Sequence, residues 1–377
     1  MLNKIKNWCK NAVGVLVGNF IIASPVLIFL TVGAVSEEKP QPQKKVQVDT
    51  ERRIQAAKEE LEKIIKENGK LSWLLLTRPE AVLPPVLALL EDELSSYGID
   101  KKELLEEIRQ NPDRFRVAVP EHWRKRFLIL TPAHEKLIGD KFDAEFAAKG
   151  KIYRNDSEMK RVRRIAERIV EQLPEPAPIR LFLLRDDTVN AFCLPNGSIY
   201  VHSGLLKNVK DDDELAFVIA HEYAHFAARH GNEGTTKTIF FMAGDILVAD
   251  AAGKLEKEGK FGRGLLLRGS YLGGGFVGAL LPLSRLWENE ADTLGFRYMS
   301  RAGYDPKGAL RFMQRLASIN PDSPLWQKLL STHPASPKRL ERMQAEYAAL
   351  KNGNSGRKWF KRSPKQQAPA AEEEKKR

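Results

Sequence analysis

Apolar and polar positions follow different patterns along the chain, and its N-terminal part stands apart from the rest. Residues 12–35 form an uncharged, mostly apolar run that follows Lys4, Lys6 and Lys10. Such a run is long enough to cross a bilayer, and the lysines before it stay on the cytoplasmic side. Residues 1–36 therefore predict a transmembrane anchor, with the rest of the chain outside the cytoplasm. A cleaved signal peptide is the alternative.

The next two segments carry no recognisable chemistry. Residues 37–50 are polar and contain prolines and glutamines, which predicts a linker. Residues 51–130 contain amphipathic, charged stretches that predict several helices, and Pro84 and Pro85 are expected to interrupt one of them. The sequence assigns these helices no role.

Three short strands are predicted in the second half of the chain. Residues 179–185, 189–194 and 198–201 are rich in the apolar and aromatic side chains that favour strands. Pro-Asn-Gly at residues 195–197 is a strong hairpin signal between the last two strands. The helix that follows carries the most informative pattern of the chain.

Residues 214–230 form an apolar run that contains His221, Glu222 and His225. The aspartates at 211–213 precede the run and supply an N-cap and negative charge for the first turn of a helix. A helix that is apolar on all sides is buried. Burying the three polar side chains without a partner would cost several kcal/mol, and a metal ion would satisfy them all.

The HExxH spacing indicates which metal and which chemistry. Two histidines four apart on a helix are rotated by only about 40° from each other, so both imidazoles point the same way. This suits two ligands of one Zn²⁺ ion, and Glu222 between them can act as a general base toward water at the metal. The pattern predicts hydrolysis of peptide bonds. The metzincin continuation HExxHxxGxxH fails, because Ala228 and Gly231 occupy its last two key positions.

A third ligand must therefore come from a later segment. Glu288 and Asp292 are again four residues apart and face one side of a predicted helix. Glu288 is the candidate zinc ligand, and Asp292 is expected to accept a hydrogen bond from the far nitrogen of a ligand imidazole. Glu290 faces the other way and is the weaker candidate.

The HExxH and SRxxExxAD motifs together resemble those of peptidase family forty-eight of the metallo class. That family includes the HtpX-type, Oma-type and CAAX-prenyl-protease-type zinc endopeptidases. Further segments resemble the family at residues 131–139, 190–206 and 331–340. The resemblance covers about residues 131–348 and is strongest to the envelope-facing branch, here without tetratricopeptide repeats.

The resemblance implies an α+β, zincin-like metallopeptidase domain at residues 131–350. This domain would be mostly helical, with an active-site helix and a small, mainly antiparallel sheet. The resemblance also implies that Asn190, Ala191 and Phe192 lie on an edge strand, where an extended polypeptide substrate adds by main-chain hydrogen bonds. Such binding suits unfolded or misfolded polypeptides. An ordinary core hairpin is the alternative.

His333 lies in a Thr-His-Pro stretch within the resemblance. Its imidazole could stabilise the oxyanion of amide hydrolysis, or act as a fourth zinc ligand that keeps the enzyme latent. A capping or surface histidine is the third alternative. Arg339 could assist the oxyanion or form a structural salt bridge. The other histidines are expected to be structural or surface residues: His122, His134, His202 and His230.

The amino-acid composition limits which classes of binding partner are expected. The 377-residue chain has a formal net charge of +12, and its tail, residues 351–377, holds nine lysines or arginines against three glutamates. We expect this tail to be disordered, with binding to an anionic surface as the alternative. No nucleic-acid motif accompanies it, so nucleic acid is not an expected partner. Cys9 and Cys193 lie in separate regions, which predicts no disulfide.

The sequence therefore predicts a zinc metalloendopeptidase on the extracytoplasmic, periplasmic side of a membrane. It is held by a single-pass anchor, or secreted to the periplasm after signal cleavage. Its expected task, quality control of envelope proteins, is implied by the resemblance. The alternatives from other classes are a catalytically silent, zinc-bound holdase and a membrane-associated binding module that works through the basic tail.

Overall fold

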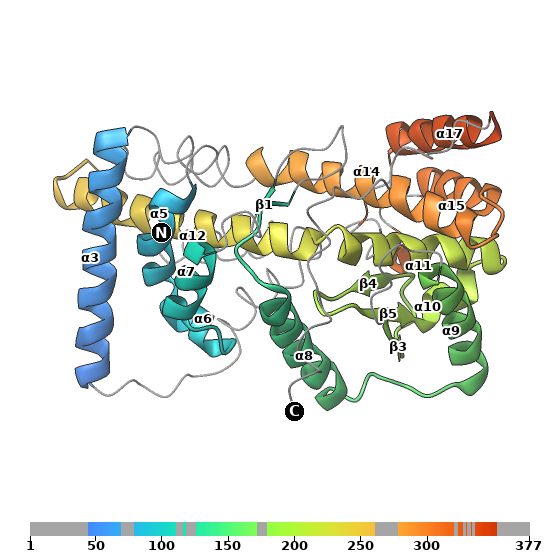
Figure 1. The fold of residues 1–377 in the computed structure, drawn as a ribbon, viewed down its shortest axis with the longest axis horizontal. Helices are drawn as coiled ribbons and strands as arrows, with labels where there is room; N and C mark the ends of the chain where they lie inside the picture. Colours follow the sequence, from blue (N-terminus) through green and yellow to red (C-terminus); the bar gives the residue numbers. More distant parts are fainter. Residues whose placement is uncertain are drawn as a thin grey trace, which may run out of the picture.

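The computed structural model describes residues 44–68, 79–110, 116–117, 126–171, 179–260, 278–319, 323–326, 329, 333 and 336–352. Within these residues helices dominate, and the strands form two small sheets (Figure 1). The helices are α3 (Lys44–Asn68), α5 (Pro79–Leu89), α6 (Glu91–Ser96), α7 (Lys101–Gln110), α8 (Pro132–Ala148), α9 (Asp156–Val170), α10 (Ser203–Asn208), α11 (Asp212–Ala227), α12 (His230–Lys257), α14 (Gly278–Arg301), α15 (Lys307–Ser318) and α17 (Pro337–Lys351). The strands are β1 (Arg116–Val117), β2 (Arg126–Phe127), β3 (Arg180–Leu184), β4 (Ala191–Cys193) and β5 (Ser198–His202).

The N-terminal helices α3, α5, α6 and α7 form a group at one end of the molecule (Figure 1). α3 begins at Lys44, so part of the segment expected as a linker is helical. Pro84 and Pro85 lie inside α5 instead of interrupting it. Their fixed φ of about −65° fits a helix, and the helix breaks only at Leu90. These helices share an apolar core with α8 and with the aromatic face of the sheet.

The expected anchor at 1–36 and all but the first two residues of the basic tail, 351–377, lie outside the described residues. Among the residues that are described, no helix combines the length and the apolar character needed to cross a membrane. Cys9 also lies outside these residues, and Cys193 is a free thiol.

The three-stranded sheet has the order β3-β5-β4. β4 and β5 form the antiparallel hairpin, with Phe192 opposite Tyr200, and Gly197 in its turn has a φ of 81°. β3 instead runs parallel to β5, with Phe182 opposite Tyr200. The expectation of a mainly antiparallel sheet is therefore wrong, and the sheet is mixed. The cause is the placement of β5, which returns from the hairpin into the position between the other two strands.

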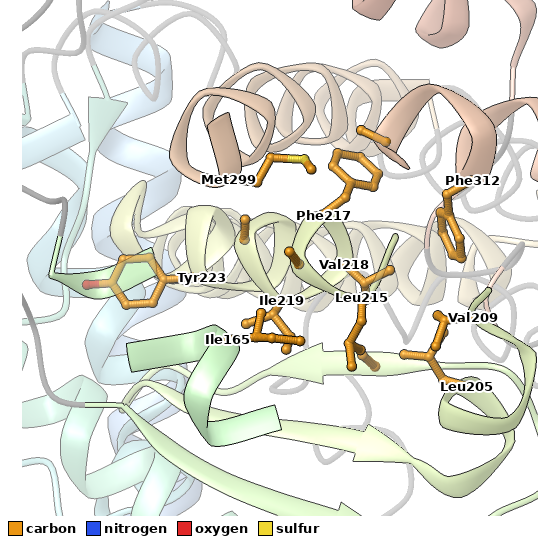
Figure 2. Packing of buried hydrophobic residues seen from close by; sticks show 14 of the residues in the cluster. Ile165, Leu205, Val209, Leu215, Phe217, Val218, Ile219, Tyr223, Met299 and Phe312 are labelled. Atoms are coloured by element: carbon orange, nitrogen blue, oxygen red, sulfur yellow. The ribbon is translucent and has the colours of Figure 1, made fainter. Parts of the chain in front are cut away.

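α11 is the central helix of the larger apolar core. Asp211 caps it, because Oδ1 of this residue accepts a hydrogen bond of 2.9 Å from the backbone nitrogen of Glu214. Residues 214–224 are all buried. The helix lies between the sheet on one side and α14 with α15 on the other, where Phe217 packs near Met299 and Phe312 (Figure 2). An apolar sequence on all sides of this helix requires such burial.

Small residues let α11 and α14 approach each other closely. Ala291 on α14 is fully buried at this contact. A Cβ atom added to Gly295 would lie only 2.8 Å from the backbone nitrogen of His221, so no larger residue fits without a shift. This close approach brings the side chain of Glu288 to the histidines of α11.

Candidate metal centre

His221 and His225 lie one turn apart on α11 and are directed at the same point. Their Nε2 atoms are 3.1 Å apart. Glu288 reaches them from α14, with Oε2 at 3.5 Å from Nε2 of His221 and Oε1 at 3.3 Å from Nε2 of His225. The three side chains expected to bind zinc therefore lie together.

His333, far along the chain, joins this group. Its Nδ1 lies 3.2 Å from Nε2 of His221 and 3.0 Å from Oε2 of Glu288. One ligand atom from each of the four residues lies within 4.8 Å of the others. Only 8% of the residue is exposed, so His333 is not a surface histidine.

These separations test whether zinc fits. Tetrahedral zinc with ligand atoms at roughly 2.0–2.1 Å separates neighbouring ligand atoms by about 3.3 Å. Five of the six pairs of these side chains have ligand atoms 3.0 to 3.5 Å apart when either oxygen of Glu288 is counted, which is close to that value, and one ligand atom from each of the four residues lies within 4.8 Å of the others. Imidazole nitrogen and carboxylate oxygen are also donors that zinc takes. The residues therefore fit a single zinc ion.

Asp292 and Arg339 form a second layer behind the ligands. Oδ1 of Asp292 lies 3.1 Å from Nδ1 of His221, which is the nitrogen turned away from the site. Arg339 on α17 donates two hydrogen bonds of 2.7 Å to the two carboxylate oxygens of Asp292. Its Nη1 also lies 3.0 Å from Oε2 of Glu288. Arg339 is therefore part of a buried ion-pair network, which was one of the two roles considered for it.

The surrounding charges change the pKa values of the cluster. Burial disfavours a charged His221, but the hydrogen bonds to Asp292 and Glu288 outweigh it and raise the pKa of His221 to about 10. Burial lowers the pKa of His225. Burial opposes the charge of Glu288 as well, yet His333 and Arg339 hold the pKa of that carboxyl well below its usual value. An ionised carboxylate therefore faces the imidazoles and favours a cation there.

Glu222 lies beside the four ligand atoms and is 2% exposed. Its Oε1 is 3.4 Å from Nε2 of His333. A cavity of about 20 Å³ borders both side chains and has room for about one water molecule. The other walls of the cavity include apolar side chains of Phe217, Val218, Phe312, Met313, Leu316 and Leu329.

Comparison with known proteins agrees with this geometry. The model of peptidase family M48 matches residues 156–347, about half of the chain. The chain belongs to peptidase family M48. This range contains both helices that carry the ligands, together with the three-stranded sheet and His333.

Three similar proteins extend this assignment. The chain is 38% identical over 164 residues to the mitochondrial metalloendopeptidase OMA1 of Schizosaccharomyces pombe, covering 44% of this chain and 45% of that protein. It is 35% identical over 164 residues to the protein of that name from Arabidopsis thaliana, covering 42% and 30%. It is 31% identical over 170 residues to a putative beta-barrel assembly-enhancing protease of Vibrio cholerae, covering 43% and 33%. The chain spans less than half the length of these curated relatives.

In this M48 chain Asn190 directly precedes β4, and Ala191 and Phe192 lie in it. β4 is one of the two outer strands of the described three-stranded sheet, and it packs against α11. The backbone oxygen of Asn190 accepts a hydrogen bond of 3.1 Å from the nitrogen of His202. The side-chain amide of Asn190 is fully buried and has no hydrogen-bond partner among the described residues. Ala191 is buried, and the ring of Phe192 stacks on Tyr200 with centroids 5.0 Å apart.

Two contacts at the centre, those of His230 with His225 and with Glu290, were not predicted from the sequence. His230, expected to be structural or on the surface, is 2% exposed, and its Nδ1 lies 2.9 Å from Nδ1 of His225. Its Nε2 lies 3.2 Å from Oε2 of Glu290. No signal in the sequence points to this contact, because α11 ends at Ala227 and the helical spacing from His225 does not continue to His230.

Proposed function

We propose that this chain is a zinc-dependent metalloendopeptidase in which His221, His225 and Glu288 bind zinc and Glu222 is the general base. The observation that carries the proposal is the set of four ligand atoms within 4.8 Å of one another, next to the buried carboxylate of Glu222. Membership of peptidase family M48 and the similarity to two kinds of named proteases support the same activity.

The metal and the surrounding residues have separate roles in the proposed hydrolysis. Bound zinc supplies a Lewis acid that polarises the peptide carbonyl and makes water more acidic. Glu222 takes the proton of the attacking water and passes it to the amine nitrogen that leaves. Asp292 holds Nδ1 of His221 and so keeps Nε2 directed at the metal position.

In this proposal His333 is a fourth ligand that keeps the enzyme latent. Its Nδ1 lies at ligand distance from the other groups, and its Nε2 lies 3.4 Å from Glu222. The imidazole of His333 would therefore occupy the open coordination position with one nitrogen and contact the general base Glu222 with the other. Activation requires His333 to move away from the zinc ligands.

The proposed substrates are unfolded or misfolded polypeptides that bind in an extended form along β4. Support comes from the position of β4 as one of the two outer strands of the described three-stranded sheet and from its packing against α11. Asn190, Ala191 and Phe192 supply the edge, and main-chain pairing requires little of the substrate's side chains.

We place the enzyme on the extracytoplasmic side of a membrane, anchored by residues 1–36, with release to the periplasm after signal cleavage as the alternative. The apolar run at 12–35 and the similarity to a protein named for beta-barrel assembly support this placement. The basic tail, residues 351–377, is a second proposed contact with an anionic surface.

The test of the activity is casein digestion by the full chain and by its Glu222→Gln variant, each also carrying His333→Ala so that latency does not hide the result. We expect Glu222→Gln to lower the rate by about 10²–10⁴ while one zinc per chain is retained. Glu214→Gln is the matched control, because Glu214 is a buried carboxylate on the same helix that pairs with Arg315. Equal rates for parent and Glu222→Gln refute the mechanism.

A second candidate function is a catalytically silent zinc protein that holds unfolded chains. One observation favours it: four side chains close the site, as in structural zinc sites. The His333→Ala variant separates the two functions. A peptidase gains a cleavage activity that depends on Glu222, whereas a holdase suppresses aggregation of a denatured client and cleaves it in neither form.

A further inference from the structure

A buried pair, His230 and Glu290, stands behind the proposed ligand His225. Nδ1 of His230 lies 2.9 Å from Nδ1 of His225, and Nε2 of His230 lies 3.2 Å from Oε2 of Glu290. His230 is 2% exposed and Glu290 is 7% exposed. The three side chains therefore form a continuous row from a carboxylate to a ligand, within the protein interior.

The contacts in this row determine which imidazole nitrogen atoms carry a hydrogen. If Nε2 of His225 offers its lone pair to a metal, Nδ1 of that neutral ring carries the hydrogen and donates it to Nδ1 of His230. His230 then carries its own hydrogen on Nε2, the nitrogen that faces the carboxylate of Glu290. The 2.9 Å contact between the two neutral imidazoles then has one donor and one acceptor, and the 3.2 Å contact of Nε2 of His230 with Glu290 is electrostatic rather than an aligned hydrogen bond.

The turn between α11 and α12 produces this arrangement. Arg229 has a φ of 54°, a conformation that residues other than glycine seldom adopt. Its guanidinium donates hydrogen bonds to both carboxylate oxygens of Glu135 and to the backbone oxygen of Leu130. These bonds hold the turn, and the turn places the first residue of α12, His230, against His225.

We propose that His230 and Glu290 are positioning residues for His225: Glu290 orients His230, and His230 holds the ring of His225 with Nε2 directed at the zinc. This inference rests on the proposed zinc site. His221 has its own carboxylate, Asp292, in direct contact. The two histidines of the HExxH motif would then each be supported by a carboxylate, one directly and one through a second imidazole.

The competing explanation is that the pair only ties α12 to α14. The same interface holds a second buried pair: Nε1 of Trp287 donates a hydrogen bond of 2.8 Å to Glu233, which also pairs with Lys237. The ring of Trp287 stacks on His230 with centroids 6.0 Å apart, but Glu233 itself is outside the row from Glu290 to His225. Glu233 is 1% exposed. Glu233→Gln is therefore a matched control, because it alters a buried carboxylate between the same two helices.

The experiment measures zinc affinity by competition with a chelator, using the full chain and the variants His230→Phe, Glu290→Gln, the double variant and Glu233→Gln. We expect His230→Phe to weaken zinc binding by about 10–100-fold, and Glu290→Gln to weaken it less. The double variant should match His230→Phe, because Glu290 acts on the metal only through His230. Glu233→Gln should leave zinc affinity within about twofold of the parent.

Unfolding of the metal-free variants shows whether stability explains the result. Affinities within twofold of the parent for both His230→Phe and Glu290→Gln overturn the inference, as do independent, additive losses in the double variant. If His230→Phe does not fold, the isosteric Glu290→Gln variant provides the test instead. The His230→Asn variant, which retains a hydrogen-bond acceptor, should then bind zinc more tightly than the double variant His230→Ala with Glu290→Gln. A parent chain that binds no zinc refutes the proposed function together with this inference, whereas zinc binding without proteolysis refutes only the peptidase.

Discussion

Arg339 holds the carboxylate of Asp292 through two hydrogen bonds of 2.7 Å, and both side chains are almost fully buried. Burial opposes the charge of Asp292, but the positive charge of Arg339 outweighs it and lowers the pKa of Asp292. Because Asp292 in turn contacts Nδ1 of His221, an arginine from α17 controls the orientation of a proposed zinc ligand on α11.

Replacing Arg339 with Met leaves the charge of Asp292 buried without its partner. We expect the free energy of unfolding of the metal-free protein to fall by about 3–5 kcal/mol, as for other broken buried ion pairs. Arg297→Met is the control, because the ion pair of Arg297 with Glu346 is partly exposed and should contribute at most about 1 kcal/mol. Denaturant unfolding measures both values, and similar losses in the two variants would contradict the prediction.

Gly295 sets the distance between α11 and α14. A Cβ atom at this position would lie 2.8 Å from the backbone nitrogen and 2.9 Å from the Cα of His221, and backbone atoms cannot rotate away. We expect Gly295→Ala to force the helices apart, to destabilise the protein by about 1–3 kcal/mol and to weaken zinc binding. The measurements are denaturant unfolding and chelator competition.

Gly253 provides the matched control for this substitution. It also lies within a helix, α12, but a Cβ atom there would have no heavy atom within 4 Å. Gly253→Ala should therefore leave zinc binding unchanged and raise stability by about 0.5–1 kcal/mol, since alanine fixes the helical backbone more readily than glycine. The idea of a steric limit at Gly295 fails if both variants behave alike.

The sequence was sufficient to predict those parts of the site that depend on regular local geometry. Four-residue spacing places His221 and His225 on one helix face whatever surrounds the helix, and the same holds for Glu288 and Asp292. The three strands followed from side-chain type and from the Pro-Asn-Gly turn. These patterns contain the information because they repeat within a single element.

Relations between elements did not follow from such patterns. Alternation in a strand does not say which neighbour it pairs with, so the parallel pairing of β3 with β5 was missed. The contact of His230 with His225 was not predicted for a similar reason, because the turn at Arg229 depends on a tertiary contact with Glu135 and not on a glycine. The ion pair between Arg339 and Asp292 joins residues 47 positions apart, which no local period can reveal.

His333 gives the sharpest test of latency. If its imidazole occupies the open coordination position, His333→Ala should raise the rate of casein cleavage and weaken zinc binding slightly, because a water replaces the ligand. If the imidazole instead stabilises the oxyanion, the same change should lower the rate by about 10²–10³. We expect the increase, since Nδ1 lies 3.0 Å from Glu288 and 3.2 Å from His221. His134→Ala is the control, because His134 accepts a hydrogen bond from the backbone nitrogen of Thr131 at the cap of α8 and is not among the four proposed ligands.

Zinc binding should release protons, because the raised pKa of His221, about 10, keeps this imidazole protonated at neutral pH in the metal-free protein. Between pH 7 and about 10 the apparent affinity should therefore rise by about tenfold for each pH unit. The stability of the metal-free protein should change in the opposite sense. A histidine whose folded pKa is raised stabilises the fold fully below its unfolded pKa of 6.5, and this contribution is lost as the pH rises toward about 10. Calorimetry in buffers of different ionisation enthalpy counts the protons, and Asp292→Asn, which removes the charge beside Nδ1, should reduce their number at pH 8. Zinc binding without proton release in the parent chain would show that His221 is neutral before the metal arrives.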